Sequence, residues 1–259
     1  MSAAALQTTA PQIHRTFEDA LLACPQGAYE FEDLVNVVVD KTAAFNDRLQ
    51  TNRVFDLGAL RTLIGIGLAH EASTLRVLDF GGAAGYHHSM AQMAFGQRIA
   101  LQWNVVETPT MARQASRLAS GTLKFFDSLA AAKDDLGSVD LLFASSSLQY
   151  CPAPLQTLQE LIDVGAKRLF ITRTPFFEGE ATIVTTQTSR LSDNGPGPLP
   201  AGYTDQPMTY PISYVPRRRV EAMLRQRYDI CFSVIEDPAT LFVGHQAVNP
   251  YHGYFCERR

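Results

Sequence analysis

Small residues between two acids form the pattern in this chain that most clearly could do chemistry. The stretch Arg76-Val-Leu-Asp-Phe-Gly-Gly-Ala-Ala-Gly85 places Asp79 at the end of an apolar run, directly before a turn of small residues. Glycine and alanine let a backbone turn sharply and approach a ligand closely. A second apolar run ends at Glu107, 22 positions after Gly85 (107 − 85). An acid at about this distance holds ribose hydroxyls in nucleotide-binding α/β folds, so the pattern predicts a nucleoside-containing ligand.

The spacing of the glycines helps to distinguish a dinucleotide from other nucleoside-containing ligands. The dinucleotide fingerprint G-x-G-x-x-G brings backbone N–H groups to a pyrophosphate, but that spacing fails from either Gly81 or Gly82. The order here is D-x-G-x-small-x-G, which begins at Asp79. A carboxylate would repel a pyrophosphate and attract a cationic group. The motif therefore favours a ligand with a positive end, and a nicotinamide cofactor is kept as an alternative.

A strand–helix alternation must position these residues. Apolar runs predict five strands and three intervening helices: strands at 75–80, 101–107, 122–126, 139–144 and 168–172, and helices at 86–95, 111–120 and 154–164. Such an alternation indicates a parallel sheet, with ligands at the carboxyl ends of its strands. Two later strands, at 228–235 and 253–258, could pair antiparallel. The predicted fold class is α/β, a Rossmann-like, doubly wound and mostly parallel seven-stranded sheet.

The segments outside this alternation define the domain organisation. Residues 1–12 are rich in Ala, Thr and Gln and predict a disordered N-terminus. Apolar residues at helical spacing over 13–70 predict an N-terminal helical extension, which could cap the substrate side or simply pack on the sheet edge. Residues 71–259 form the main domain. Within it, residues 174–214 predict a long polar loop, whose Gly and Pro content would suit a lid.

The motif and the alternation together resemble the class I S-adenosylmethionine-dependent methyltransferases, whose first motif is usually written E/D-x-G-x-G-x-G. Ala83 replaces the middle glycine, which we expect the backbone to tolerate at a negative φ. The segments V-L-D-F-G-G, V-V-E-x-P, S-L-Q-Y and R-T-P are similar, more narrowly, to a poorly characterised bacterial branch of methyltransferases. The resemblance covers about residues 75–172, and the C-terminus by topology only. It implies S-adenosyl-L-methionine as the cofactor.

The resemblance also assigns roles in cofactor binding. The glycine loop would lie against the methionine moiety, and Glu107 would accept hydrogen bonds from both ribose hydroxyls. Thr108 would border the adenine, and Asp127 would bind the adenine amino group unless it caps a helix instead. The serines after the fourth strand would face the methyl group. The implied cofactor residues are Asp79, Gly81, Gly82, Ala83, Gly85, Glu107, Thr108, Asp127, Ser145 and Ser146.

Candidate catalytic residues follow from the chemistry of methyl transfer. The protein mainly aligns the reactants and excludes water, but an oxygen acceptor also needs its proton removed. His87 opens a helix, where a neutral imidazole able to accept a proton is favoured. Tyr150 could orient an acceptor or form an aromatic wall, and Arg173 could bind a carboxylate or phosphate of the substrate or pair within its own loop. His88, Gln149 and Gln187 are further candidates for acceptor contacts, although one of the two histidines could simply pack.

Composition narrows the class of partner. The 259-residue chain carries a net charge of −4 at pH 7, so it has no basic footprint for nucleic acid. No run of 18 apolar residues could span a membrane. The four cysteines form no C-x-x-C pair and no metal-ligand spacing, which is typical of reduced thiols in a cytoplasmic protein. We therefore expect a small-molecule substrate, no metal and no membrane, with an oligomer possible.

The function that these observations favour is methyl transfer from S-adenosylmethionine to a small-molecule or carbohydrate-like acceptor, at oxygen. Two alternatives belong to other classes. The chain could bind the cofactor without turnover, since Ala83 departs from the motif and no general base is obvious. It could also be an NAD-dependent oxidoreductase, which would need a pyrophosphate beside Asp79.

Overall fold

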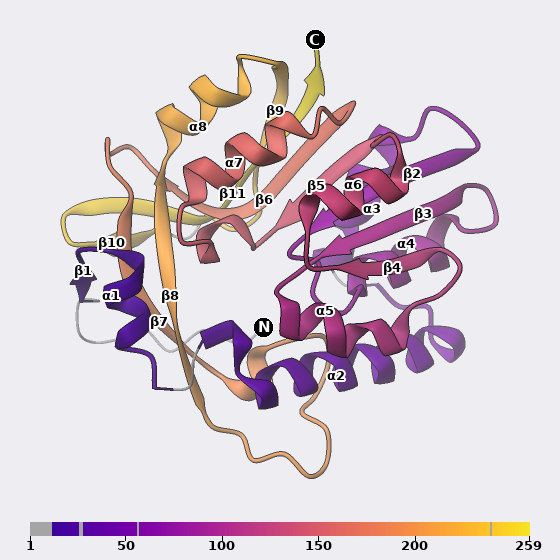
Figure 1. Cartoon of the computed structure of the whole chain (residues 1–259), viewed down its shortest axis with the longest axis horizontal. Coiled ribbons are helices and arrows are strands. Elements are labelled where there is room, and N and C mark those ends of the chain that lie inside the picture. Colours follow the sequence, from indigo (N-terminus) through magenta and orange to yellow (C-terminus); the bar gives the residue numbers. More distant parts are fainter. Residues whose placement is uncertain (1–11, 26–27, 56, 239) are drawn as a thin grey trace.

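The computed structural model describes residues 12–25, 28–55, 57–238 and 240–259 (Figure 1). Its helices are α1 Phe17–Leu22, α2 Glu32–Thr51, α3 Leu57–Ala69, α4 Tyr86–Phe95, α5 Pro109–Ala115, α6 Leu129–Leu136, α7 Pro154–Asp163 and α8 Arg217–Leu224. Short 3-10 turns include η1 Ala28–Glu30 and η3 Leu148–Tyr150. Its strands are β1 Ile13–His14, β2 Thr74–Phe80, β3 Ala100–Val106, β4 Leu123–Phe126, β5 Leu141–Ser145, β6 Arg168–Phe177, β7 Ile183–Arg190, β8 Pro207–Pro216, β9 Tyr228–Ile235, β10 Leu241–Val243 and β11 Gln246–Arg258.

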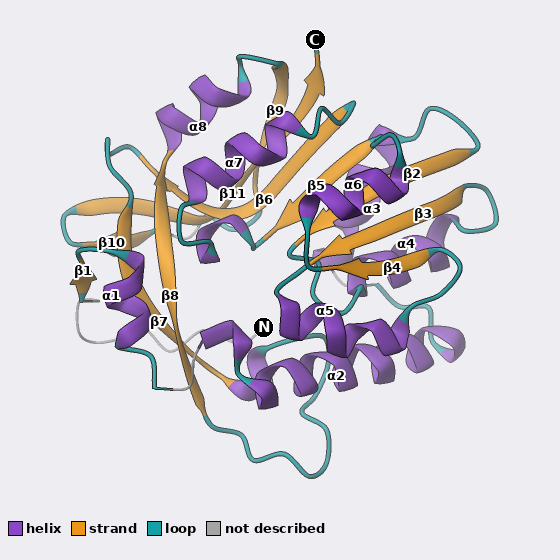
Figure 2. Ribbon diagram, in the orientation of Figure 1, coloured by secondary structure: helices purple, strands orange, loops and turns teal. Residues whose placement is uncertain are grey.

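The described residues form an eleven-stranded sheet and not the predicted seven-stranded one, and its central part consists of the seven strands that the sequence predicts. Their spatial order is β4-β3-β2-β5-β6-β11-β9, as Figure 2 allows the reader to follow. The first five are mutually parallel, and β11 runs antiparallel to both β6 and β9. This arrangement confirms the doubly wound, mostly parallel sheet with an antiparallel terminal pair. Because parallel strands end on the same side, the loops after β2, β3, β5 and β6 meet at one edge.

Helices cover both faces of this sheet, and the pleat decides which side chains each layer contacts. Leu78 packs with residues of α6, α7 and α8 on one face. Val77 packs on the other face with residues of α3 and α4, near Trp103 and Phe143. In Figure 1, α6 and α7 lie in front of the strands and α4 lies behind them. Since successive residues of a strand alternate, Asp79 shares the face of Val77.

The segment 174–214 is not a loop, so that prediction is wrong. β7 and β8 pair antiparallel along their whole length, β1 adds to β7, and β8 joins the end of β6 at Phe176 and Phe177. One face of β8 buries Met208, Tyr210 and Ile212, whereas β7 consists mainly of Thr, Ser and Gln. β7 has few apolar residues of its own, so its local pattern is that of a loop, and it forms a strand because it pairs with β8, the next strand of the chain.

The segment 13–70 supplies three helices: α1 packs against β7 and β8, α2 packs against α4 and α5, and α3 covers a face of the central sheet. α1 contacts β7 and β8, where Ala20 is fully buried. α2 is tied to the connection between β7 and β8, because Lys41 Nζ donates to the Ser192 carbonyl at 2.7 Å and the Tyr203 hydroxyl donates to Asp40 at 2.9 Å. The domain boundaries at 12 and 70 stay predictions. The predicted disordered segment lies outside the described residues, except for residue 12.

Two further elements were not predicted. α6 follows β4, and the Ser128 hydroxyl caps it by accepting from the Ala131 amide at 3.4 Å. β10 pairs with β11 as a short hairpin. Within the described part of the chain, no helix combines the length and the apolar character needed to cross a membrane.

Candidate functional site

The glycine loop joins β2 to α4 and packs against its surroundings so closely that side chains are excluded. Gly81 has a φ of +70°, and a Cβ there would lie 2.2 Å from the Cβ of Ser147. A Cβ on Gly82 would lie 2.4 Å from Oδ2 of Asp79. Gly85 adopts a φ of +82° as the residue that begins α4. The loop therefore requires glycine where it touches the ends of β2 and β5.

Ala83 adopts a left-handed backbone with a φ of +49°, so the expected negative φ is wrong. An L-residue in this region costs about 1–2 kcal/mol. The Ala83 amide donates a hydrogen bond to Oε1 of Glu107 at 2.9 Å. This bond helps to hold the strained turn and joins the loop to the end of the neighbouring strand.

Glu107 follows β3 and lies beside the glycine loop. Its second oxygen, Oε2, accepts from the Thr108 amide at 2.9 Å. Burial raises the pKa of Glu107 to about 7, against the opposing effect of the two amide hydrogen bonds. A ligand whose hydroxyls donate to this carboxylate would stabilise its ionised form. Thr108 itself caps α5, since its hydroxyl accepts from the Met111 amide at 3.4 Å.

Asp79 is a fully buried carboxylate with two side-chain partners. Oδ2 accepts a hydrogen bond from the indole Nε1 of Trp103 at 3.1 Å and lies 3.0 Å from Nδ1 of His87. A carboxylate can only accept, so Nδ1 of His87 carries the proton in this contact and Nε2 is left for another partner. The His87 ring packs edge-on against Phe143 of β5. The fold thus brings Asp79 and His87 together as an acid–imidazole pair beneath the glycine loop.

The loop after β5 lies against the same edge. Ser145 accepts a hydrogen bond from the Thr172 hydroxyl at 3.1 Å, and Ser146 has a φ of +57°. The Gln149 amide nitrogen donates to Oγ of Ser146 at 3.1 Å and to the carbonyl of Arg173 at 3.0 Å. Gln149 therefore joins the ends of β5 and β6.

Three buried oxygens at this edge have no hydrogen-bond partner among the residues that the structure describes. They are Oδ1 of Asp79, Oγ of Ser147 and Oε1 of Gln149. Asp79 and Ser147 lie on the two sides of the Gly81–Gly82 backbone, because their atoms are the nearest neighbours of the two absent Cβ positions. Buried polar groups without partners are costly and uncommon in folded proteins. Their concentration beside one glycine loop indicates a place for a ligand that donates hydrogen bonds.

Three tyrosines and an amide form a wall next to this loop. Tyr150 lies 4.7 Å from Tyr29 of η1 and 5.6 Å from Tyr210 of β8, measured between ring centroids. Its hydroxyl donates to Oε1 of Gln187 on β7 at 3.4 Å. Burial raises the pKa of Tyr150 to about 12, so at neutral pH it donates a proton in hydrogen bonds and does not act as a base.

His88 lies apart from this group, whereas Asp127 follows β4 at the same edge of the sheet as the glycine loop. His88 is buried against Trp103, and its Nε2 lies 3.0 Å from the hydroxyl of Thr122 at the amino end of β4, the edge opposite the glycine loop. Burial lowers the pKa of His88 to about 4. The packing alternative therefore describes His88, and we do not assign it to substrate. Asp127 is exposed after β4, and the helix that follows is capped by Ser128 and not by Asp127.

Several residues at this edge were missed by the sequence interpretation. Ser147 follows directly after the two predicted serines, so the loop itself was a usable signal. Trp103 lies on the second strand, with even spacing to Val105 and Glu107, but no local pattern shows that its indole reaches Asp79. Tyr29 and Tyr210 come from segments far from the motif, and only the tertiary structure brings them to Tyr150.

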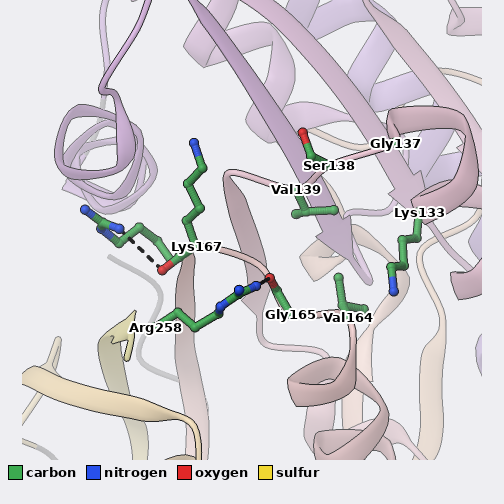
Figure 3. Close-up of a pocket in the computed structure, with 9 residues that line it drawn as sticks. Lys133, Gly137, Ser138, Val139, Val164, Gly165, Lys167 and Arg258 are labelled. Atoms are coloured by element: carbon green, nitrogen blue, oxygen red, sulfur yellow. Dashed lines mark hydrogen bonds between the residues drawn. The ribbon is translucent and has the colours of Figure 1, made fainter.

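A separate pocket of about 430 Å³ opens at the amino ends of β5 and β6 (Figure 3). Cationic side chains surround it, but Lys167 pairs with Asp140 at 2.9 Å and Arg168 pairs with Glu71 at 2.6 Å. Arg258 donates to the carbonyl of Gly165 at 2.7 Å, as the dashed line in Figure 3 marks. None of the predicted site residues lines it, and ligands of open α/β sheets bind at the other edge.

The described residues contain no group of three or more His, Cys, Asp or Glu side chains that could hold a metal ion. Cys24, Cys151, Cys231 and Cys256 are present as free thiols.

Comparison with known proteins rests on structure. No protein-family model matches the sequence, and no curated protein matches it. A crystal structure of an uncharacterized protein from Burkholderia thailandensis overlaps 93% of this chain and 86% of its own, with a TM-score of 0.55 and 12% identity. A methyltransferase from Clostridium acetobutylicum overlaps 85% of this chain and 98% of its own, with a TM-score of 0.49 and 11% identity. An amino pentose methyltransferase from Micromonospora echinaspora, with S-adenosylmethionine bound, overlaps 78% of this chain and 90% of its own, with a TM-score of 0.46 and 12% identity.

The strand order, together with the overlap at a TM-score of 0.55, decides the fold class. The fold is a Rossmann-like, doubly wound α/β fold. At these sequence identities the similarity concerns the fold alone. Cofactor, activity and acceptor must therefore be argued from the residues at the site.

Proposed function

We propose that this chain transfers a methyl group from S-adenosylmethionine to a hydroxyl oxygen of a small-molecule acceptor. The observation that carries the proposal is the set of unpartnered buried oxygens beside the glycine loop, on Asp79, Ser147 and Gln149. An ammonium group has three N–H donors and no acceptor, so it complements these oxygens. The cofactor's amino-acid end is such a group. A pyrophosphate offers only acceptors and negative charge, which disfavours the dinucleotide alternative.

The remaining cofactor contacts follow from the same edge of the sheet. Glu107 would accept from the ribose hydroxyls, since it lies beside the glycine loop and each of its oxygens keeps a further lone pair. Thr108 would border the adenine, and the exposed carboxylate of Asp127 after β4 would bind the adenine amino group. The proposed set is Asp79, Gly81, Gly82, Ala83, Gly85, Glu107, Thr108, Asp127, Ser145, Ser146 and, newly, Ser147.

His87 supplies the general base that an oxygen acceptor needs. When bound, the cofactor supplies an activated methyl group on a sulfonium. His87 is oriented by Asp79 through Nδ1, so its Nε2 can accept the proton of an acceptor hydroxyl. Asp79 would then stabilise the imidazolium that forms. A positioned acid–imidazole pair favours turnover over the alternative of binding alone.

The acceptor would lie between the tyrosine wall and the end of β6. Tyr150 would donate to acceptor oxygens, and Gln187 would orient it through the hydroxyl contact at 3.4 Å. The rings of Tyr29 and Tyr210 present apolar surface beside these polar groups, which would suit a compact acceptor with several hydroxyls, such as a carbohydrate. Arg173 would contact the acceptor from the opposite side. Oligomer formation and a cytoplasmic location stay predictions.

Calorimetric titration with S-adenosylhomocysteine tests the cofactor assignment. We expect micromolar binding to the wild type and loss of binding in Glu107→Ala. Asp134→Ala is the matched control, because it removes an exposed carboxylate on α6, away from the glycine loop. NAD titrated in parallel should not bind. A folded wild-type protein that binds NAD and not S-adenosylhomocysteine would overturn the proposal.

A further inference from the structure

Two arginines from distant parts of the chain come together beside the part of β6 that follows its pairing with β5. Arg61 lies on α3, and its side chain is only 8% exposed. Its Nη1 pairs with Glu236, which follows β9. The Glu236 amide donates to the carbonyl of Tyr251 at 3.1 Å, and the Arg173 guanidinium lies 5.7 Å from the Tyr251 ring centroid, so both arginines lie beside Tyr251. Burial lowers the pKa of Arg61, the paired Glu236 raises it, and the positive charge of Arg173 lowers it.

The backbone directs Arg173 toward this place. Its φ of +54° lies in the left-handed region, a strain of about 1–3 kcal/mol for a residue other than glycine. The register between β6 and β11 shifts on both sides of His252, which pairs with Thr174, the residue after Arg173. Gln149 holds the Arg173 carbonyl at 3.0 Å, and the guanidinium lies 5.7 Å from the ring centroid of Tyr251. Bulges of this kind re-aim side chains next to functional sites.

The charges of this pair are not balanced. Among the described residues, Arg61 has one carboxylate partner, Glu236, and Arg173 has no carboxylate within ion-pair distance. Nε of Arg61 is buried and has no hydrogen-bond acceptor. A guanidinium stays protonated in proteins and offers five donors, so these groups lack acceptors. An excess of positive charge at the sheet edge also contrasts with the net charge of −4 of the whole chain.

We propose that Arg61 and Arg173 form an oxyanion-binding site that holds a carboxylate or phosphate group of the acceptor. Arg173 presents a planar fork of donors to the anion, and Arg61 adds its free Nε–H. Gln149 links Arg173 to the loop after β5, so the anion lies beside the proposed acceptor region. The assignment of the anion to the acceptor rests on the proposed methyl transfer, whereas the anion site itself does not.

The test follows the arginine Nε–H resonances of the folded wild-type protein by NMR during titration with inorganic phosphate and with acetate. We expect the Arg61 and Arg173 signals to shift in a saturable way. Arg173→Gln should weaken binding about tenfold or more, as the loss of charge-assisted hydrogen bonds implies. Arg61→Lys keeps the charge and the Glu236 pair but removes Nε, and should weaken binding less. Arg258→Gln alters the pocket of Figure 3 and should leave the anion affinity unchanged.

The outcomes separate the sources of the anion and the two proposals. Tighter phosphate binding indicates a phosphorylated acceptor, and tighter acetate binding indicates a carboxylate. No shift of the Arg61 and Arg173 signals with either anion, or a loss of affinity in Arg258→Gln equal to that in Arg173→Gln, would overturn the anion site. Titration of the same samples with S-adenosylhomocysteine tests methyl transfer separately: failure there with anion binding intact contradicts the proposed function alone.

Discussion

Replacing Glu107 by Gln should make the stability of the protein less dependent on pH. Burial raises the pKa of this carboxyl from 4.5 to about 7 in the folded state. Between these values the folded state keeps a proton that the unfolded chain releases, so wild-type stability falls as the pH rises through this window and is level above it. A shift of about 2.5 units corresponds to roughly 3 kcal/mol, at about 1.4 kcal/mol per pKa unit.

Glutamine has no charge, so this loss disappears in the variant. Its single oxygen can satisfy only one of the Ala83 and Thr108 amides, which adds a cost of about 1–3 kcal/mol at every pH. The cost of the lost hydrogen bond is the same at every pH, whereas the contribution of Glu107 ionisation to the wild-type free energy of unfolding changes with pH. The stability of Glu107→Gln relative to wild type should therefore rise by roughly 3 kcal/mol from pH 4.5 to pH 8.

Urea unfolding at pH 5, 6, 7 and 8, followed by the fluorescence of the single Trp103, measures this difference. Asp134→Asn is the control, because it removes an exposed carboxylate and should leave the pH dependence as in wild type. A difference between Glu107→Gln and wild type that stays flat from pH 5 to pH 8 would refute the reasoning, since the carboxyl would then titrate alike in both states.

Four further predictions follow from the site. Wild-type affinity for S-adenosylhomocysteine should rise up to about tenfold from pH 6 to pH 8 and level off above pH 8, because ribose hydroxyls donate to ionised Glu107; calorimetry that shows no pH dependence contradicts this. Ala83→Gly should stabilise the protein by up to about 1 kcal/mol in urea unfolding by relieving the left-handed backbone; destabilisation would mean that the strain is absent. Trp103→Phe should destabilise it by about 1–3 kcal/mol, since Asp79 loses a buried donor; an unchanged unfolding midpoint would argue against that hydrogen bond. His87→Gln should lower kcat about 100-fold or more with little change in cofactor affinity; equal losses in both would indicate a structural role.

Local pattern alone predicted much of the main domain. The helix at 86–95 and the strand at 228–235 agree with the structure to the residue. The five parallel strands were located within two residues at their amino ends. The apolar runs and the glycine turn encode these elements, because periodicity and turn chemistry depend on near neighbours in the chain. The same local signals located the glycine loop and Glu107.

Pairing across the chain decided what the sequence did not show. β7 is too polar to read as a strand, and it becomes one because it pairs with β8. A helix-opening His87 was identified from its position, but only the fold shows that its Nδ1 contacts Asp79. Ala83 was expected at a negative φ, yet the hydrogen bond to Glu107 holds it left-handed.

The sequence by itself determined the fold class, and it predicted the edge of the sheet where we propose that ligand binds and the chemical type of the residues there. The tertiary structure decided which side chains from remote segments face that edge. Arg61 meets Glu236 across 175 positions, and Tyr29 meets Tyr150 and Tyr210 from η1. The physical reason is that such contacts depend on how whole helices and strands pack. Neither residue of a contacting pair has sequence neighbours that would indicate its partner.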